Sequence, residues 1–166
     1  MPPVVDHRSR VLILGSMPGA ASLAARAYYA FPRNQFWDIM ATLFACDRNL
    51  AYEHRLEHLL QCGVALWDVI ASCRRSGSLD AAIDSASVRP HDIRKLLVEF
   101  PAISAIGFNG REAERQYLLQ AKRQLDVPPL SVTLRVLPST SPAMASLSFV
   151  EKCERWRVFF RATGLL

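Results

Sequence analysis

Four short runs of apolar, often β-branched residues place the strongest constraint on the fold of this chain. Between them, apolar residues recur at helical spacing. Near-continuous apolar runs are typical of strands covered on both faces, as in a parallel sheet between helices. The sequence therefore predicts an α/β fold, a three-layer α/β/α sandwich with a four-stranded, mainly parallel sheet. The predicted strands are Arg10–Leu14, Gly63–Val69, Ile103–Phe108 and Val132–Leu137.

Helix signals lie between these runs. Apolar residues at helical spacing predict helices over Phe36–Ala45 and Tyr52–Leu60. Pro90 with Asp92 just after it indicates the first turn of another helix. Asn109 and Glu112 resemble a capping arrangement for a helix over Arg111–Gln124. Ser148 and Glu151 form a capping box for the last helix. Its predicted inner face consists of Val150, Cys153, Trp156 and Phe160.

Composition limits the class of protein. The chain has 166 residues, of which 51% are hydrophobic and 21% charged, so we expect one domain over residues 1–166 with a proper core. No apolar stretch reaches the roughly 20 residues of a membrane-spanning helix, and the N-terminus lacks the apolar region of a secretory signal. The four cysteines form no paired CxxC pattern and are predicted to be free thiols. We therefore expect a soluble, cytoplasmic protein, in the bacterial cytoplasm or nucleoid.

The charge balance is basic. Lys plus Arg is 20 against 15 Asp plus Glu, a net charge of +5. This excess favours a polyanionic partner such as nucleic acid. All the cations except Lys95, Lys122 and Lys152 are Arg, whose guanidinium matches phosphate well. A GC-rich genome would produce the same Arg bias, so the composition leaves both explanations open.

Three loops beyond the predicted strands could carry chemistry. The first is Gly15-Ser-Met-Pro-Gly19, where glycine lets backbone amides approach a ligand closely. The second is Tyr28-Tyr-Ala-Phe-Pro-Arg-Asn-Gln-Phe-Trp37, which places aromatic rings beside Arg and amide side chains, as a base-stacking and phosphate-holding site requires. The third is Leu137-Pro-Ser-Thr-Ser-Pro-Ala143, which offers hydroxyls and free amides for phosphate. Taken singly, the first and third are also ordinary turns.

Together these segments resemble the uracil-DNA glycosylase superfamily. GSMPG, then YYAFPRNQFW and a late LPSTSPA are most similar to the hypoxanthine (deoxyinosine) and mismatch-specific branch, as are LWDVIASCRRSGSLD and GFNGREA. The resemblance implies a monofunctional DNA glycosylase that flips a damaged nucleotide and hydrolyses the bond between base and sugar. It implies deoxyinosine as the substrate, damaged DNA as the partner and no metal or organic cofactor. We expect a monomer.

The same resemblance implies roles for individual residues. Asn34 would be the catalytic amide that positions water. Tyr29 would stack on the flipped base, and Met144 would be an apolar wedge in the gap that the base leaves. The rest of the base pocket would consist of Gly15, Ser16, Met17 and Asp68. Phosphates would be held by Arg33, Ser139 and Ser141.

Three departures from the family pattern shape this interpretation. Met17 stands where uracil enzymes place an Asp and mismatch-specific ones an Asn, so it cannot orient water. Leu137 replaces the His that stabilises a departing uracil anion. Both argue against a fast general uracil enzyme. Asp68 replaces an Asn that reads the base. When ionised, Asp68 accepts hydrogen bonds but donates none, so it does not choose between hypoxanthine and uracil, and it could also be a capping or ion-paired residue.

Other functions stay open. One alternative is uracil excision restricted to mismatches, and another is a damage-binding module with little turnover. His54 to His58 spells H-x-x-E-H, an inverted zincin signature. Both histidines fall opposite the apolar stripe formed by Tyr52, Leu56, Leu59 and Leu60. Zinc there would face solvent without a third ligand, so a solvated helix face is the preferred interpretation.

Overall fold

The fold is built around a sheet of four parallel strands in the order β2-β1-β5-β6. The computed structural model describes residues 1–124 and 132–166, except the side chains of 122–124. The four strands confirm the four predicted runs to within two residues at each end. They are β1 (Val11–Gly15), β2 (Val64–Asp68), β5 (Ala105–Asn109) and β6 (Thr133–Leu137).

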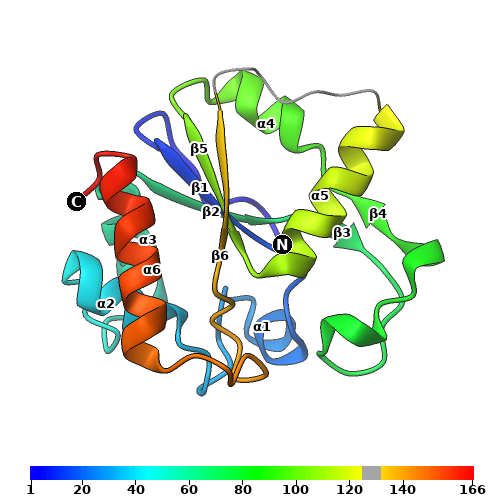
Figure 1. Ribbon diagram of the computed structural model, residues 1–166, viewed down its shortest axis with the longest axis horizontal. Coiled ribbons are helices and arrows are strands. Elements are labelled where there is room, and N and C mark those ends of the chain that lie inside the picture. The colour runs from blue at the N-terminus through cyan, green and yellow to red at the C-terminus, as the bar shows by residue number, and fades with distance from the viewer. Residues whose placement is uncertain (125–131) are drawn as a thin grey trace.

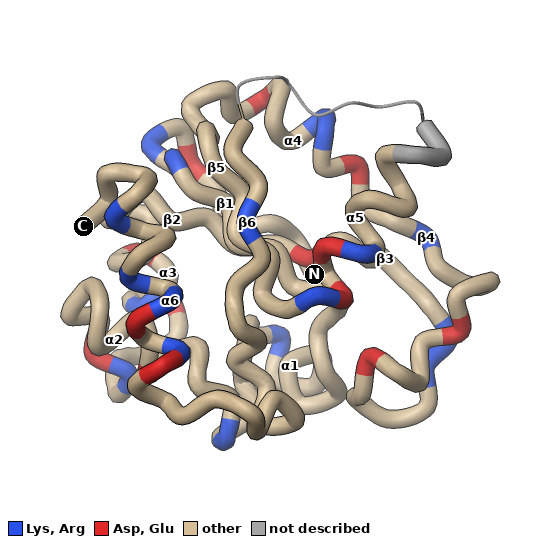
Figure 2. The backbone as a smooth tube through the Cα atoms, viewed as in Figure 1, with Lys and Arg blue, Asp and Glu red and all other residues tan. Residues whose placement is uncertain are grey.

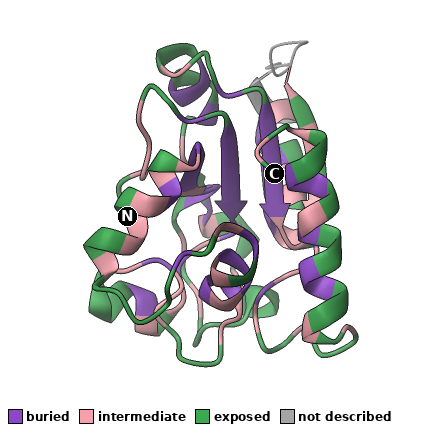
Figure 3. Ribbon diagram, turned by 90° about the vertical axis from the view of Figure 1, so that its left-hand side faces the viewer, coloured by how far each residue is buried: buried purple, intermediate pink, exposed green. Residues whose placement is uncertain are grey.

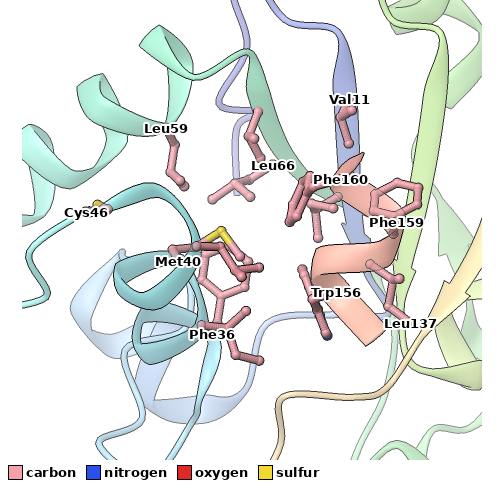
Figure 4. Close-up of a cluster of buried hydrophobic side chains, with 14 of the residues drawn as sticks. Val11, Phe36, Met40, Cys46, Leu59, Leu66, Leu137, Trp156, Phe159 and Phe160 are labelled. Carbon is pink, nitrogen blue, oxygen red and sulfur yellow. The ribbon is translucent and has the colours of Figure 1, made fainter. Parts of the chain in front are cut away.

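Helices cover both faces of this sheet, as the apolar strands require (Figure 1). On one face, α2, α3 and α6 bury a cluster that includes Phe36, Leu59 and Trp156 (Figure 4). On the other, α4 and α5 bury residues that include Leu96 and Tyr117. Strands β1 and β5 are buried almost along their whole length (Figure 3), which confirms the three-layer prediction. The helices are α1 (Ala20–Ala25), α2 (Phe36–Phe44), α3 (Tyr52–Gln61), α4 (Ile93–Glu99), α5 (Arg111–Gln124) and α6 (Phe149–Ala162).

A second, two-stranded sheet was not predicted. It pairs β3 (Ile70–Ser72) with β4 (Arg89–Pro90) in antiparallel fashion, and two short 3₁₀ turns, Asp80–Ala82 and Ser85–Ser87, lie between them. The prediction that Pro90 opens a helix is therefore wrong. Pro90 pairs with Ile70, and α4 begins at Ile93 with Asp92 as its cap, accepting from the Lys95 amide at 2.9 Å.

The last helix confirms one prediction and corrects another. Ser148 and Glu151 form the predicted capping box. Cys153, Trp156 and Phe160 are buried as predicted, but Val150 is 75% exposed. Lys152 and Phe159 complete the inner stripe, because helical spacing places residues 152, 153, 156, 159 and 160 on one face and residue 150 on the other.

Candidate functional site

The carboxyl ends of the four strands gather the predicted site residues at one edge of the sheet. The register places Gly15 beside Asp68 and Asn109 beside Leu137. The first loop and the late Leu137–Ala143 loop therefore leave the sheet from the same edge, at the bottom of Figure 1. In folds of this type, ligands bind in the crevice beyond this edge.

Gly15 and Asp68 form the most crowded part of this edge. A Cβ at Gly15 would lie 2.6 Å from Asp68 Oδ1 and 3.7 Å from the Tyr29 hydroxyl, so only glycine fits. Asp68 is 4% exposed, and its Oδ2 is buried without a hydrogen-bond partner among the described residues. Burial raises the pKa of Asp68 to about 7. A carboxyl that is part protonated at neutral pH can donate as well as accept a hydrogen bond, which widens the role expected from the sequence.

Tyr29 is held in an unusual conformation beside Asp68. Its φ of 56° lies in the left-handed region, which a bulky residue seldom adopts. Its ring stacks on Phe36 with centroids 4.0 Å apart and planes 20° apart. Burial raises the pKa of Tyr29, and the Asn109 side chain acts in the opposite direction. Backbone strain of this kind clusters at ligand sites, so the strain supports a functional position for Tyr29.

Asn34 lies at the entry to α2. Its backbone N–H donates to Phe31 O at 2.8 Å, and its side-chain Oδ1 accepts from the backbone N–H of Phe36 at 3.0 Å. Asn34 therefore makes a cap-like contact at the start of α2. Within the described residues its Nδ2 makes no hydrogen bond, and Asn34 is half-buried. Arg33 is exposed, with its guanidinium 5.4 Å from the centre of the Phe31 ring.

The late loop is fastened through a residue that the sequence analysis did not single out. Thr140 is fully buried. Asn109 Nδ2 donates to Thr140 Oγ1, and the Thr140 amide donates to Asn109 Oδ1, both at 2.9 Å. Thr140 O accepts from the Gln35 amide at 3.0 Å. The helix-capping role predicted for Asn109 is therefore wrong, because both ends of its amide are bonded to Thr140.

The predicted phosphate contacts lie on either side of Thr140. Ser139 Oγ accepts from the Ser141 amide at 3.2 Å, and Ser141 Oγ accepts from the Ala143 amide at 3.3 Å. Both hydroxyls accept in these contacts, so both keep a proton to donate. Ser139 and Met144 line a groove of about 1140 Å³ between α5, β6 and α6, whereas Asp68 and Tyr29 do not line it. The structure thus divides the predicted residues between two sides of the same edge.

The segment between β3 and β4 covers the first loop, which no sequence pattern had indicated. Asp80 Oδ1 accepts from Ser16 Oγ at 2.7 Å. Arg75 donates to Pro18 O at 2.6 Å, and Cys73 Sγ lies 3.1 Å from Met17 Sδ. Burial raises the pKa of Asp80. A carboxylate therefore reaches the first loop from another part of the chain, although position 17 itself is apolar.

The histidine motif is not arranged as a metal site. His54 is exposed, and a ring nitrogen of His58 lies 2.8 Å from Phe44 O. In the part of the chain that the structure describes, no three His, Cys, Asp or Glu residues are grouped to hold a metal ion.

Three further observations concern charge, hydropathy and the cysteines. Basic and acidic positions are interspersed along α6 (Figure 2), so phosphate binding would depend on individual side chains. No helix among the described residues is long and apolar enough to cross a membrane. All four cysteines are free, as predicted.

Comparison with known proteins identifies the family. The family model described as "Uracil DNA glycosylase superfamily" matches residues 2–161. The chain is 33% identical to the hypoxanthine DNA glycosylase of Methanosarcina acetivorans over 162 residues, 96% of both chains. It is 34% identical to the protein of the same name from Methanosarcina barkeri over 122 residues, 72% of this chain and 76% of that one.

A solved structure agrees with these relatives. The solution NMR structure of a Methanosarcina acetivorans protein described as a uracil DNA glycosylase superposes with a TM-score of 0.78 at 30% identity. The match covers 98% of this chain and 96% of that one. This chain is accordingly a member of the uracil DNA glycosylase superfamily.

Proposed function

We propose that this protein is a DNA repair glycosylase that removes a deaminated base, foremost the hypoxanthine of deoxyinosine, and leaves an abasic site. The observation that carries the proposal is the buried Asp68 carboxyl, whose Oδ2 lacks a partner in the described residues beside Gly15 and Tyr29. A buried polar atom without a partner costs free energy. This carboxyl can accept from the N1–H of hypoxanthine or from the N3–H of uracil, so it supports a site that reads a deaminated base without choosing between the two. The names of the Methanosarcina relatives support hypoxanthine as that base.

The residues then divide the reaction between them. A flipped base enters beside Tyr29 and Asp68, and Asn34 orients a water molecule against the anomeric carbon. As the bond between the water oxygen and the anomeric carbon forms, the bond to the base breaks, the base leaves with its electron pair, and the proton that the water loses ends on the departing base. Arg33, Ser139 and Ser141 hold the flanking phosphates, and Met144 fills the space left in the duplex. Catalysis here is positioning, because an amide cannot serve as an effective base at neutral pH.

Ser16 and Asp80 fix the direction of hydrogen bonding in the first loop. The single hydroxyl proton of Ser16 is directed at Asp80, so Ser16 Oγ can only accept from a bound group. A water molecule or an N–H of the base supplies such a donor. Asp80 thus compensates in part for the absence of a polar side chain at Met17.

Leu137 bears on the choice between hypoxanthine and uracil. It is 2% exposed, and its side chain packs against Gly107 in the core. It offers no donor to a departing uracil anion. Mismatch-restricted uracil excision is therefore the second candidate, ranked below hypoxanthine excision.

The test is single-turnover incubation with duplexes that carry inosine, uracil, xanthine or ethenoadenine, followed by alkaline cleavage at abasic sites. We expect strand breaks in the inosine duplex, and none with Asn34→Ala on the same timescale. A damage-binding module would instead shift the inosine duplex in a gel and leave it uncut.

A further inference from the structure

Lys152 has no place in the reaction described above, yet it is the most unusual charge in the fold. Its side chain is 2% exposed on the inner face of α6. Its Nζ donates to Gln35 Oε1 at 2.8 Å. Across residues 1–124 and 132–166, no Asp or Glu forms an ion pair with it. A buried ammonium with one neutral acceptor is costly to the folded state.

Two further features make this position unfavourable for a cation. Lys152 is the fourth residue of α6, where the helix dipole is positive and disfavours a cation. Burial also lowers the pKa of the Lys152 ammonium, because desolvation disfavours the charged form. The other members of the inner stripe of α6 are apolar, so the lysine is the exception on this face.

The contact of Lys152 lies at the junction of the two loops proposed to bind DNA. Gln35 follows Asn34 directly, and its amide donates to Thr140 O in the late loop. Lys152 therefore holds a residue that joins the Asn34 segment to the loop of Ser139 and Ser141. Its charge therefore lies next to the residue that links the two segments proposed to face phosphate and the reacting sugar.

We propose that Lys152 is a positioning residue whose buried charge serves the anionic groups of bound DNA and not the stability of the fold. It fixes the Gln35 side chain and places positive potential under the loop junction. In a poorly solvated site, such a charge acts over a longer range than it would in water. This inference rests on the proposed function, because it requires DNA at this edge of the sheet.

The experiment compares Lys152→Met with Lys95→Met, which removes an exposed lysine of α4. Thermal melting, affinity for a duplex with a tetrahydrofuran abasic analogue, and single-turnover base release are measured for each. We expect Lys152→Met to melt at or above the wild-type temperature while affinity or base release falls about tenfold, with Lys95→Met changing either by less than twofold. Lost affinity for the abasic duplex would locate the anion at a phosphodiester. A loss confined to base release would locate it at the departing base.

Gln35→Glu keeps the shape of the contact and gives Lys152 a carboxylate partner. We expect this variant to melt higher than the wild type and to lose affinity or base release to a similar degree. If Lys152→Met fails to fold, Gln35→Glu alone tests the proposal. The proposal is overturned if Gln35→Glu, or a folded Lys152→Met, stays within twofold of wild type in both affinity and base release. If the wild type binds the abasic duplex but releases no base, the proposed function fails, and the affinity measurements still test Lys152.

Discussion

The two sides of the candidate site differ in whether their buried polar groups have hydrogen-bond partners. On the side of the late loop, Asn109 and Thr140 satisfy each other, and Gln35 joins them to the start of α2. On the side of the first loop, Asp68 keeps an unpartnered buried oxygen, within the described residues, beside a strained Tyr29. A satisfied network rigidifies its surroundings, whereas unsatisfied buried groups gain when a ligand arrives. The difference fits the proposal of a scaffold on one side and a base pocket on the other.

The largest expected effect tests Asn34, which lies where the two sides meet. Loss of one well-placed contact to a transition state typically costs about 2.7–4 kcal/mol, or 10²–10³ in rate. We expect Asn34→Ala to slow single-turnover base release by that factor, with duplex affinity nearly unchanged. Because Oδ1 accepts from the Phe36 amide, melting should also reveal a loss of about 1 kcal/mol. A lowered melting temperature with a near-normal rate would reduce Asn34 to a capping residue.

The next prediction concerns pH and the pocket side alone. In the fold the pKa of Asp68 is raised from 3.8 to about 7, so the protonated form is the favoured one. This stability contribution is present in full below 3.8 and is lost as pH rises through about 7. At 1.36 kcal/mol per unit, the loss between pH 5 and pH 8 is about 2–3 kcal/mol. Asp68→Asn should remove it, so the variant should gain on the wild type in free energy of unfolding as pH rises. Parallel stability curves would mean that Asp68 is solvated or paired.

Tyr29 separates stacking from hydrogen bonding on the same side. Base–aromatic stacking contributes about 1–3 kcal/mol. Tyr29→Phe keeps the ring and should be mild, whereas Tyr29→Ala should weaken binding of an inosine duplex by about that amount. The measurement is duplex affinity in an Asn34→Ala background, which prevents turnover. Equal losses from both substitutions would assign the effect to the hydroxyl.

On the scaffold side, the sequence predicted the helices and strands better than it predicted the hydrogen bonds between them. Near-continuous apolar runs predicted all four strands of the main sheet, and Ser148 with Glu151 predicted the start of α6. Asn109 was misassigned because an Asn before a helix is usually a cap. Its actual partner is 31 residues away, and no local pattern encodes a contact at that separation. Thr140 went unnoticed for the same reason.

On the pocket side, the sequence motifs named the site residues but not every segment that contacts them. Motif resemblance named Gly15, Ser16, Met17, Tyr29 and Asp68, and the structure places Gly15 against both Asp68 and Tyr29. What the motifs could not supply was Asp80, because the segment between β3 and β4 has no periodicity to predict its course over the first loop. Lys152 was missed because a lysine within an amphipathic helix is ordinarily assigned to the solvent face.

The smallest expected effect tests Arg33, which belongs to neither the scaffold side nor the pocket side. Arg33 is exposed, and basic and acidic positions are interspersed along α6 (Figure 2). A single phosphate contact contributes about one unit to the slope of log affinity against log salt. Arg33→Gln should therefore weaken binding of any duplex by a few-fold at low salt and lower that slope by about one. Because such a contact carries no sequence information, inosine and undamaged duplexes should lose equally. Titrations of both duplexes from low to physiological salt measure this. A loss confined to the inosine duplex would place Arg33 in the base pocket.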